Sequence, residues 1–302
     1  MDHPTILIPV PPFFSFQECL WFLNRNYDDC LHVISDNAIW KAIQTPFGDV
    51  LFHIQEHGGF LEIETLAGPA NPECRDFLTS FVKEWFDLER DIQPFYAHLK
   101  RDKRLAYMAD DFTGLRLIGI SDMFEALCWC IIGQQINLTF AYKLKRRLVE
   151  RFGRHLEWDN QVFYIFPDAE TLANAEVDEL RAMQFSEKKA QYISGIARAF
   201  VAGMLSKEGI AALPDFPAQQ KALTSHKGIG IWTANYALMK SLRVPQGIPH
   251  GDVGLLNALV AHGIIADRTE KDKINAFFGA FAGWETYLAF YLWRSLAVKA
   301  LV

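Results

Sequence analysis

The spacing of apolar residues over most of the chain is the feature that most limits its fold. From about residue 72 onward they recur at intervals of three and four, which is the period of a helix with one buried face. The ranges predicted as helices are 73–92, 121–135, 137–153, 168–180, 186–204, 216–226, a helix that starts after Gly230, 252–263 and a closing pair within 270–299. This pattern predicts a large helical domain.

The start of the chain has a different pattern, rich in β-branched and aromatic residues between turn signals. A helix over 15–26, with Ser15 as its N-cap, interrupts the strands, and the glycines of "HGG" at 57–59 favour a hairpin. The predicted strands are 5–10, 30–35, 38–45, 49–55 and 60–66. We therefore expect an α+β fold, with a small N-terminal antiparallel α/β domain at residues 1–90 and a large all-α domain at residues 91–302.

Composition narrows the class of protein. Half of the 302 residues are apolar, yet no apolar run is long enough to cross a membrane. The first residues lack the basic start and cleavage site of a signal peptide. The five cysteines all precede residue 131 and form no C-x-x-C pair, so free, buried thiols are expected. We expect a cytoplasmic or nuclear monomer that binds no membrane.

The net charge of −6 argues against a nucleic-acid partner, because such proteins usually carry a basic excess. A local basic patch is still compatible with an acidic surface elsewhere. The densest basic run is Lys143, Lys145, Arg146, Arg147, Arg151 and Arg154. Taken by itself, this run is best interpreted as the solvated face of an amphipathic helix.

A short turn at 227–230 offers a different way to hold DNA. Lys227, Gly228, Ile229 and Gly230 separate two predicted helices. Two glycines one residue apart permit positive φ and leave backbone N–H groups uncovered. At the start of a helix, such groups bind a phosphate without needing many lysines. The alternative is an ordinary helical hairpin with a glycine cap.

The residues around this turn resemble a motif of a known protein family. The string "L-x-x-x-x-G-I-G-x-W-T-A-x-Y" at 223–236 closely resembles the helix-hairpin-helix motif of DNA base-excision glycosylases, in particular the 3-methyladenine DNA glycosylase II branch. The stretches "IIGQQINLTFAYKLKRRLVERFG", "PPFFSFQECLWFLNRN" and "GWETYLAFYLW" resemble further parts of that branch. The resemblance implies a helix-hairpin-helix glycosylase domain that acts on double-stranded DNA.

The resemblance also implies roles for individual residues. Asp252 matches the catalytic aspartate, and the 227–230 turn matches the hairpin that holds a phosphate, where relatives often bind a monovalent cation on backbone carbonyls. Gln135 occupies the position at which some relatives place an apolar wedge. No metal is required and no cofactor is implied. As an alternative to catalysis, an aspartate at the start of 252–263 is also an ordinary N-cap.

Aromatic residues complete the implied site. Trp232, Tyr236 and Trp284 match positions that line the base pocket, where electron-rich rings would favour a cationic purine. Spaced four apart on a helix, Trp232 and Tyr236 could equally be core residues. Bifunctional members of the superfamily carry a nucleophilic lysine where this chain has Trp232. Members with an iron–sulfur cluster carry four cysteines after the aspartate, and this chain has none there.

The function that follows is hydrolytic removal of alkylated purines, such as 3-methyladenine and 7-methylguanine. The base must leave the duplex stack before its sugar bond can be reached. Asp252 would stabilise the cationic sugar, and the product would be an abasic site. Two alternatives stay open: a glycosylase for hypoxanthine or an oxidised purine, and a non-catalytic DNA-binding protein that uses the hairpin alone.

Overall fold

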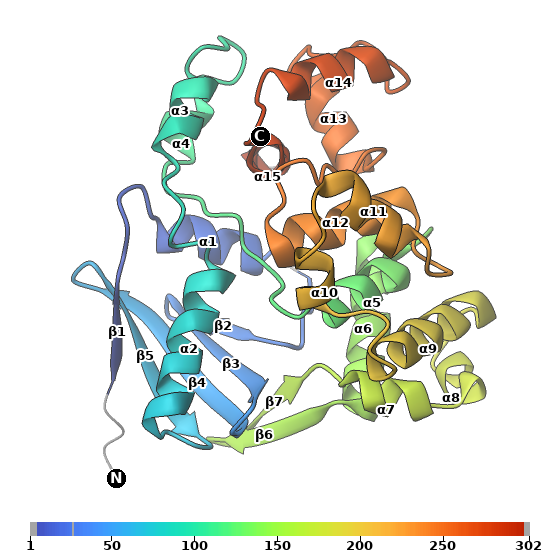
Figure 1. Ribbon diagram of the computed structural model, residues 1–302. Helices are drawn as coiled ribbons and strands as arrows, with labels where there is room; N and C mark the ends of the chain where they lie inside the picture. The colour runs from blue at the N-terminus through green and yellow to red at the C-terminus, as the bar shows by residue number, and fades with distance from the viewer. Residues whose placement is uncertain (1–4, 26, 299–302) are drawn as a thin grey trace.

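The computed structural model describes residues 5–25 and 27–298. Its first part is an antiparallel sheet with the strand order β1-β5-β4-β3-β2 (Figure 1). The strands are β1 (Ile6–Pro9), β2 (Val33–Ser35), β3 (Ala38–Thr45), β4 (Gly48–His57) and β5 (Phe60–Ala67). The expected hairpin is confirmed, since His57 pairs with Phe60 across Gly58 and Gly59.

Fifteen helices lie within the described residues. They are α1 (Phe16–Leu23), α2 (Pro72–Trp85), α3 (Gln93–Leu99), α4 (Met108–Asp111), α5 (Met123–Gly133), α6 (Leu138–Phe152), α7 (Ala169–Asn174), α8 (Val177–Ala182), α9 (Glu187–Val201), α10 (Lys207–Ala211), α11 (Phe216–Thr224), α12 (Ile231–Leu242), α13 (Val253–Ala261), α14 (Lys271–Gly279) and α15 (Glu285–Val298). None of them is both long and apolar enough to cross a membrane.

Some predicted helix ends agree with local capping chemistry, whereas the helix predicted over 73–92 ends at Trp85 and the one predicted over 168–180 is divided into α7 and α8. Ser15 accepts a hydrogen bond from Glu18 N at 3.2 Å and starts α1, which ends at Leu23. The predicted end of that helix at residue 26 lies outside the described residues. Asn137 caps α6, and Gly153 ends it through a bond from its N–H to the Val149 carbonyl. Caps of this kind satisfy backbone groups that the helix itself leaves without partners.

The fold class is confirmed, with one addition to the helical part. Residues 154–165, for which the sequence pattern gave no element, form a ribbon of β6 (Arg154–Trp158) and β7 (Gln161–Ile165). Phe163 and Ile165 of β7 pack on Ala42 and Leu51 of the first sheet. The second part of the chain is therefore not entirely α. A short ribbon with a half-exposed face gives a weak sequence signal, and its partners lie about a hundred residues away.

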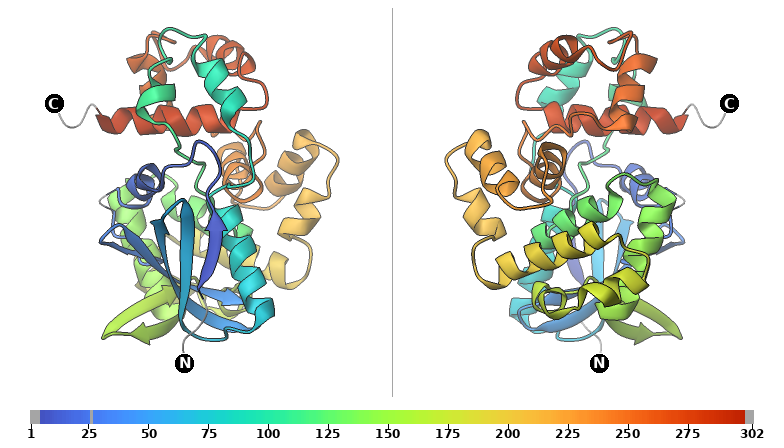
Figure 2. Two further views of the ribbon diagram at one scale, coloured as in Figure 1. Left: turned by 90° about the vertical axis from the view of Figure 1, so that its left-hand side faces the viewer. Right: turned by 90° about the vertical axis from the view of Figure 1, so that its right-hand side faces the viewer.

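Besides this small cluster, two large clusters of buried side chains hold the molecule together. The first joins the sheet and α2 to α3, α13, α14 and α15, whereas the second is built from α5, α6 and α7 to α12. The clusters therefore do not separate at residue 90, the expected domain boundary. Figure 2 shows the sheet at one end of the molecule and α13–α15 at the other.

Candidate active site

The turn between α11 and α12 is shaped by its two glycines in different ways. Gly228 has a φ of 94°, and a Cβ there would lie 2.4 Å from Cγ of Tyr192 on α9. Only glycine fits this position without strain. Gly230 is the N-cap of α12 with an ordinary φ of −86°, and a Cβ there would meet no atom within 4 Å. Gly228 therefore packs directly against Tyr192 of α9, whereas the space next to Gly230 is free.

The remaining hairpin residues divide between core and solvent. Ile229 is buried in the second cluster, and Lys227 is exposed. The start of α12 therefore presents its first N–H groups and the Lys227 side chain to solvent. This arrangement suits a phosphate group, as the sequence indicated. A cation on this turn would be held by backbone carbonyls, of which Gly228 O accepts one hydrogen bond and keeps a second lone pair.

A glutamine in the turn between α5 and α6 fastens that turn to the hairpin. Gln134 Nε2 donates to Gly228 O at 3.0 Å and lies 3.4 Å from Thr233 Oγ1. Its neighbour Gln135, the predicted wedge, is exposed and has a φ of 59°. Sequence reasoning assigned no role to Gln134, although it lies in the quoted "GQQ" stretch. The structure therefore brings the predicted wedge turn and the predicted phosphate hairpin together.

Asp252 lies at the start of α13 with its carboxylate held on one side. Its Oδ1 accepts a hydrogen bond from Leu255 N at 2.8 Å, so it is an N-cap. The same oxygen accepts from Trp293 Nε1 at 2.9 Å. Within residues 5–25 and 27–298 the structure records no hydrogen bond to Oδ2. One oxygen therefore fixes the side chain, and the other is available to act on a substrate.

The loop that leads to Asp252 is tied to the hairpin helices. Asn235 on α12 donates from Nδ2 to Ile248 O at 2.6 Å, and its Oδ1 accepts from Gln220 Nε2 of α11 at 2.7 Å. Gly251 completes the turn with a φ of 84°. These two hydrogen bonds, one buried and one partly buried, fix the position of the aspartate relative to the hairpin.

Three aromatic rings form a continuous wall next to Asp252, which we call the aromatic wall: Trp232, Tyr236 and Trp293. The rings of Trp232 and Tyr236 stack with centroids 5.3 Å apart, and Tyr236 lies 6.3 Å from Trp293. All three rings are partly exposed or border open space. Rings in this arrangement offer π faces to a planar ligand.

The expectation for Trp284 is corrected by the structure. Trp284 packs against Phe95 and Tyr287, with ring centroids 5.7 and 5.6 Å away. It lies just before α15, nine residues from Trp293, a separation of roughly 13 Å along a helix axis. Both tryptophans belong to the same aromatic-rich segment, and the sequence does not say which turn of the helix faces Asp252. Trp293 is the site residue that sequence reasoning missed.

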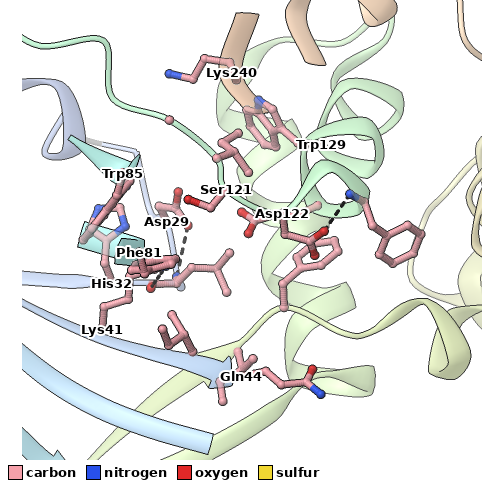
Figure 3. A pocket seen from close by; sticks show the side chains of 18 of the residues that line it. Asp29, His32, Lys41, Gln44, Phe81, Trp85, Ser121, Asp122, Trp129 and Lys240 are labelled. Atoms are coloured by element: carbon pink, nitrogen blue, oxygen red, sulfur yellow. Dashed lines mark hydrogen bonds between the residues drawn. The ribbon is translucent and has the colours of Figure 1, made fainter. Parts of the chain in front are cut away.

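A cavity of about 610 Å³ lies between the first sheet and α5 (Figure 3), and Tyr236 is the member of the aromatic wall that lines it. Tyr236 and Lys240 of α12 line it together with Trp85 from α2. Lys240 is fully buried, donates to Ile118 O and has its amine 4.4 Å from the centre of the Phe22 ring. Burial lowers the pKa of Lys240 well below its ordinary value.

Four of the six basic residues between 143 and 154 form ion pairs, and the expectation of a solvated helix face holds only in part. Lys145 is buried and contacts Asp29 at 3.0 Å and Glu125 at 3.5 Å. Burial opposes ionisation of Asp29, but the Lys145 ammonium prevails and holds the pKa of this carboxyl well below its usual range. The other ion pairs of the run are Arg146 with Asp28 and Glu150, Arg151 with Glu179, and Arg154 with Asp49.

Other reactive groups give no sign of a second chemistry. The five cysteines are buried and unpaired, as predicted. In the described ranges, histidine, cysteine, aspartate and glutamate do not gather in any group of three that could hold a metal ion. The site thus consists of one carboxylate, an aromatic wall and a turn of exposed amides.

Comparison with known proteins gives the class. Residues 128–281 match the family model described as HhH-GPD superfamily base excision DNA repair protein, and residues 26–127 match the 8-oxoguanine DNA glycosylase N-terminal domain. The chain therefore belongs to the HhH-GPD superfamily of base excision DNA repair proteins, and its class is that of the DNA glycosylases.

Individual relatives agree with this class. The chain is 37% identical over 299 residues to a DNA-3-methyladenine glycosylase of Bacillus subtilis, covering 97% of this chain and 98% of the relative. Among solved structures, the 3-methyladenine DNA-glycosylase of Archaeoglobus fulgidus superposes with a TM-score of 0.85 at 24% identity, over 98% and 100% of the two chains. The Clostridium acetobutylicum 8-oxoguanine glycosylase/lyase bound to DNA gives 0.74 at 21%, again over 98% and 100%. These structural matches establish the fold.

Proposed function

We propose that the enzyme removes alkylated purines such as 3-methyladenine and 7-methylguanine by hydrolysis and leaves an abasic site. The observation that carries this proposal is the aromatic wall beside the carboxylate of Asp252. A desolvated aromatic face favours a cation by about 2 kcal/mol or more. The B. subtilis relative, a DNA-3-methyladenine glycosylase, supports the same substrate class.

The chemistry follows from the charge on such a base. An N-alkylated purine departs with the electron pair of the glycosidic bond and becomes neutral, so it needs no dedicated acid. The sugar that remains is an oxocarbenium-like cation, as in glycoside hydrolysis. Oδ2 of Asp252 would stabilise that cation and orient a water toward C1′. As its oxygen bonds to C1′, the water would give up a proton to the Asp252 carboxylate, which then releases it to solvent and completes hydrolysis.

We propose a monofunctional enzyme because Trp232 stands where the lyases carry a lysine. Lys227 precedes Gly228 and lies on the other side of the turn. Lys240 on α12 is buried, and its amine donates to Ile118 O. Borohydride treatment during turnover on an alkylated duplex should trap no covalent protein–DNA adduct. A trapped adduct would contradict the monofunctional assignment.

The main experiment uses duplex DNA methylated with dimethyl sulfate. Wild-type enzyme should release 3-methyladenine and 7-methylguanine, resolved by chromatography, and the Asp252→Asn variant should release neither. Defined duplexes with one hypoxanthine or one 8-oxoguanine test the alternative substrates, which the match to an 8-oxoguanine glycosylase N-terminal domain makes worth including. Release of those bases without methylated purines would overturn the proposal, as would DNA binding without any base release.

A further inference from the structure

Three large aliphatic side chains are exposed around the active site, each as the first residue of a helix. Leu138 begins α6 and is 45% exposed, Ile231 begins α12 and is 59% exposed, and Val253 begins α13 and is 61% exposed. We call these three residues the aliphatic rim. Single exposed aliphatic residues are ordinary on a protein surface. A set that coincides with three site segments calls for an explanation.

Two members directly follow a residue already placed in the site, and the third follows the turn that carries Gln135. Ile231 follows Gly230 of the phosphate hairpin, and Val253 follows Asp252. Leu138 follows Asn137, the cap that closes the turn carrying Gln135. The rim therefore marks the three segments from which the site is built.

Hydrogen bonds and ring contacts hold these three segments together. Gln134 Nε2 binds Gly228 O, which joins the turn before α6 to the turn before α12. The aromatic wall joins the first turns of α12 to Trp293, whose indole binds Asp252 at the start of α13. The starts of the three helices thus surround one site, and in Figure 1 their helices share the side of the molecule away from β1 and β5.

The class of the protein indicates that duplex DNA is the partner that covers this surface. A DNA glycosylase places duplex DNA over the pocket that receives the base, and nucleic-acid contacts combine phosphate groups with the C–H edges of sugars. Backbone amides and Lys227 can bind phosphate, but only apolar side chains can exclude water from the sugar edges. Proteins that open a duplex from the minor groove often use apolar residues against it.

We propose that the aliphatic rim is an apolar contact surface for the deoxyribose edges of duplex DNA on both sides of the extruded nucleotide. Leu138 supplies the apolar contact beside Gln135, whose side chain is polar. Ile231 covers the sugar next to the phosphate that the hairpin binds, and Val253 covers the sugar next to Asp252. These contacts exclude water around the site and add affinity that does not depend on charge.

Apolar contacts with DNA differ from phosphate contacts in how the binding constant depends on salt concentration. Each phosphate neutralised by a lysine releases counterions, so the logarithm of the binding constant falls steeply with the logarithm of the salt concentration. Loss of an apolar contact weakens binding equally at every salt concentration and leaves that slope unchanged. Truncation of one rim side chain that DNA covers should weaken binding about 3- to 10-fold, because it removes two or three carbon groups of which only about half the surface is exposed and can become covered.

The test measures fluorescence anisotropy on a duplex that contains one tetrahydrofuran abasic analogue, at four salt concentrations. Leu138→Ala, Ile231→Ala and Val253→Ala should each raise Kd by about 3- to 10-fold with the wild-type salt slope. Lys227→Ala should instead make the slope shallower by roughly one unit. Since the analogue carries no base, this result is independent of which lesion the enzyme removes.

Matched controls come from exposed apolar residues elsewhere. Val201 is 57% exposed at the end of α9, and Met204 beyond it is 70% exposed. Val201→Ala and Met204→Ala should leave Kd unchanged. Thermal unfolding should show that all six variants remain folded, because these side chains are exposed. Wild-type Kd in all three rim variants, or equal weakening in the two control variants, would overturn the proposal.

Discussion

The indole N–H of Trp293 donates a hydrogen bond to Oδ1 of Asp252 across 2.9 Å. These residues lie 41 positions apart, on α15 and at the start of α13. The same oxygen also accepts from Leu255 N at 2.8 Å. Two donors on one oxygen restrain the carboxylate, and Oδ2 is left for the substrate. This contact makes Trp293 both a ring of the aromatic wall and a positioning residue for Asp252.

Replacement of Trp293 by phenylalanine tests this positioning role. Trp293→Phe keeps an aromatic face but removes the N–H, and hydrogen bonds to charged groups contribute about 1.5–3 kcal/mol. We expect a roughly 10- to 100-fold lower single-turnover rate of 7-methylguanine excision, with little change in DNA affinity. Trp284→Phe is the control and should excise at nearly the wild-type rate. An effect of Trp284→Phe larger than that of Trp293→Phe would return Trp284 to the site.

The charge of Asp252 is tested by Asp252→Asn. The asparagine oxygen can still accept from Leu255 N and Trp293 Nε1, and asparagine caps helices about as well as aspartate. We expect the free energy of unfolding of the variant, measured in urea, to lie within about 0.5 kcal/mol of that of the wild type. Excision should fall by about 100-fold or more, because the negative charge beside C1′ is lost. If the variant kept near wild-type excision, Asp252 would be a cap and no more.

The two hairpin glycines should respond differently to alanine. At Gly228 the positive φ and the Tyr192 ring oppose a Cβ, so Gly228→Ala should destabilise the protein by about 2 kcal/mol or more. At Gly230 an added Cβ meets no atom within 4 Å, so Gly230→Ala should leave the free energy of unfolding nearly unchanged. It should nevertheless weaken binding to an abasic-analogue duplex, because the new methyl group blocks the approach of a phosphate. Urea unfolding and anisotropy measure the two effects, and unchanged DNA affinity in Gly230→Ala would contradict the phosphate assignment.

The pair of buried Lys145 and largely buried Asp29 predicts a pH-dependent contribution to stability. The pKa of Asp29 is lower in the folded than in the unfolded protein. The pair therefore stabilises fully above the unfolded pKa of about 4 and loses effect as the pH falls below it. Asp29→Asn should lower the unfolding free energy at pH 7 by about 2–4 kcal/mol.

Urea unfolding at pH 7, 5 and 3 checks this prediction. The difference between wild type and Asp29→Asn should be similar at pH 7 and 5 and should shrink at pH 3. Asp28→Asn is the matched control, because Asp28 is largely exposed and pairs with Arg146 near the surface. Surface pairs of this kind contribute about 1 kcal/mol or less. A larger loss from Asp28→Asn than from Asp29→Asn would contradict the assignment.

Local sequence signals predicted much of the site. The spacing of Gly228 and Gly230 before a periodic helix is a short-range pattern, and so is the aspartate at the start of α13. Trp232 and Tyr236 lie four residues apart, and helix geometry alone makes such rings neighbours. For these residues the backbone conformation follows from the chain within a few positions, and the structure places them as their spacing indicates.

Tertiary packing decided the rest. Trp284 and Trp293 stand in one aromatic segment, and only the packing of α15 on α13 turns the second toward Asp252. The tie from Gln134 to Gly228 spans 94 positions, and the β6–β7 ribbon is stabilised by strands about a hundred residues earlier. A sequence pattern reports which side chains share a face of one element. Which faces meet depends on the combined packing of all elements, and that is set only when the chain folds.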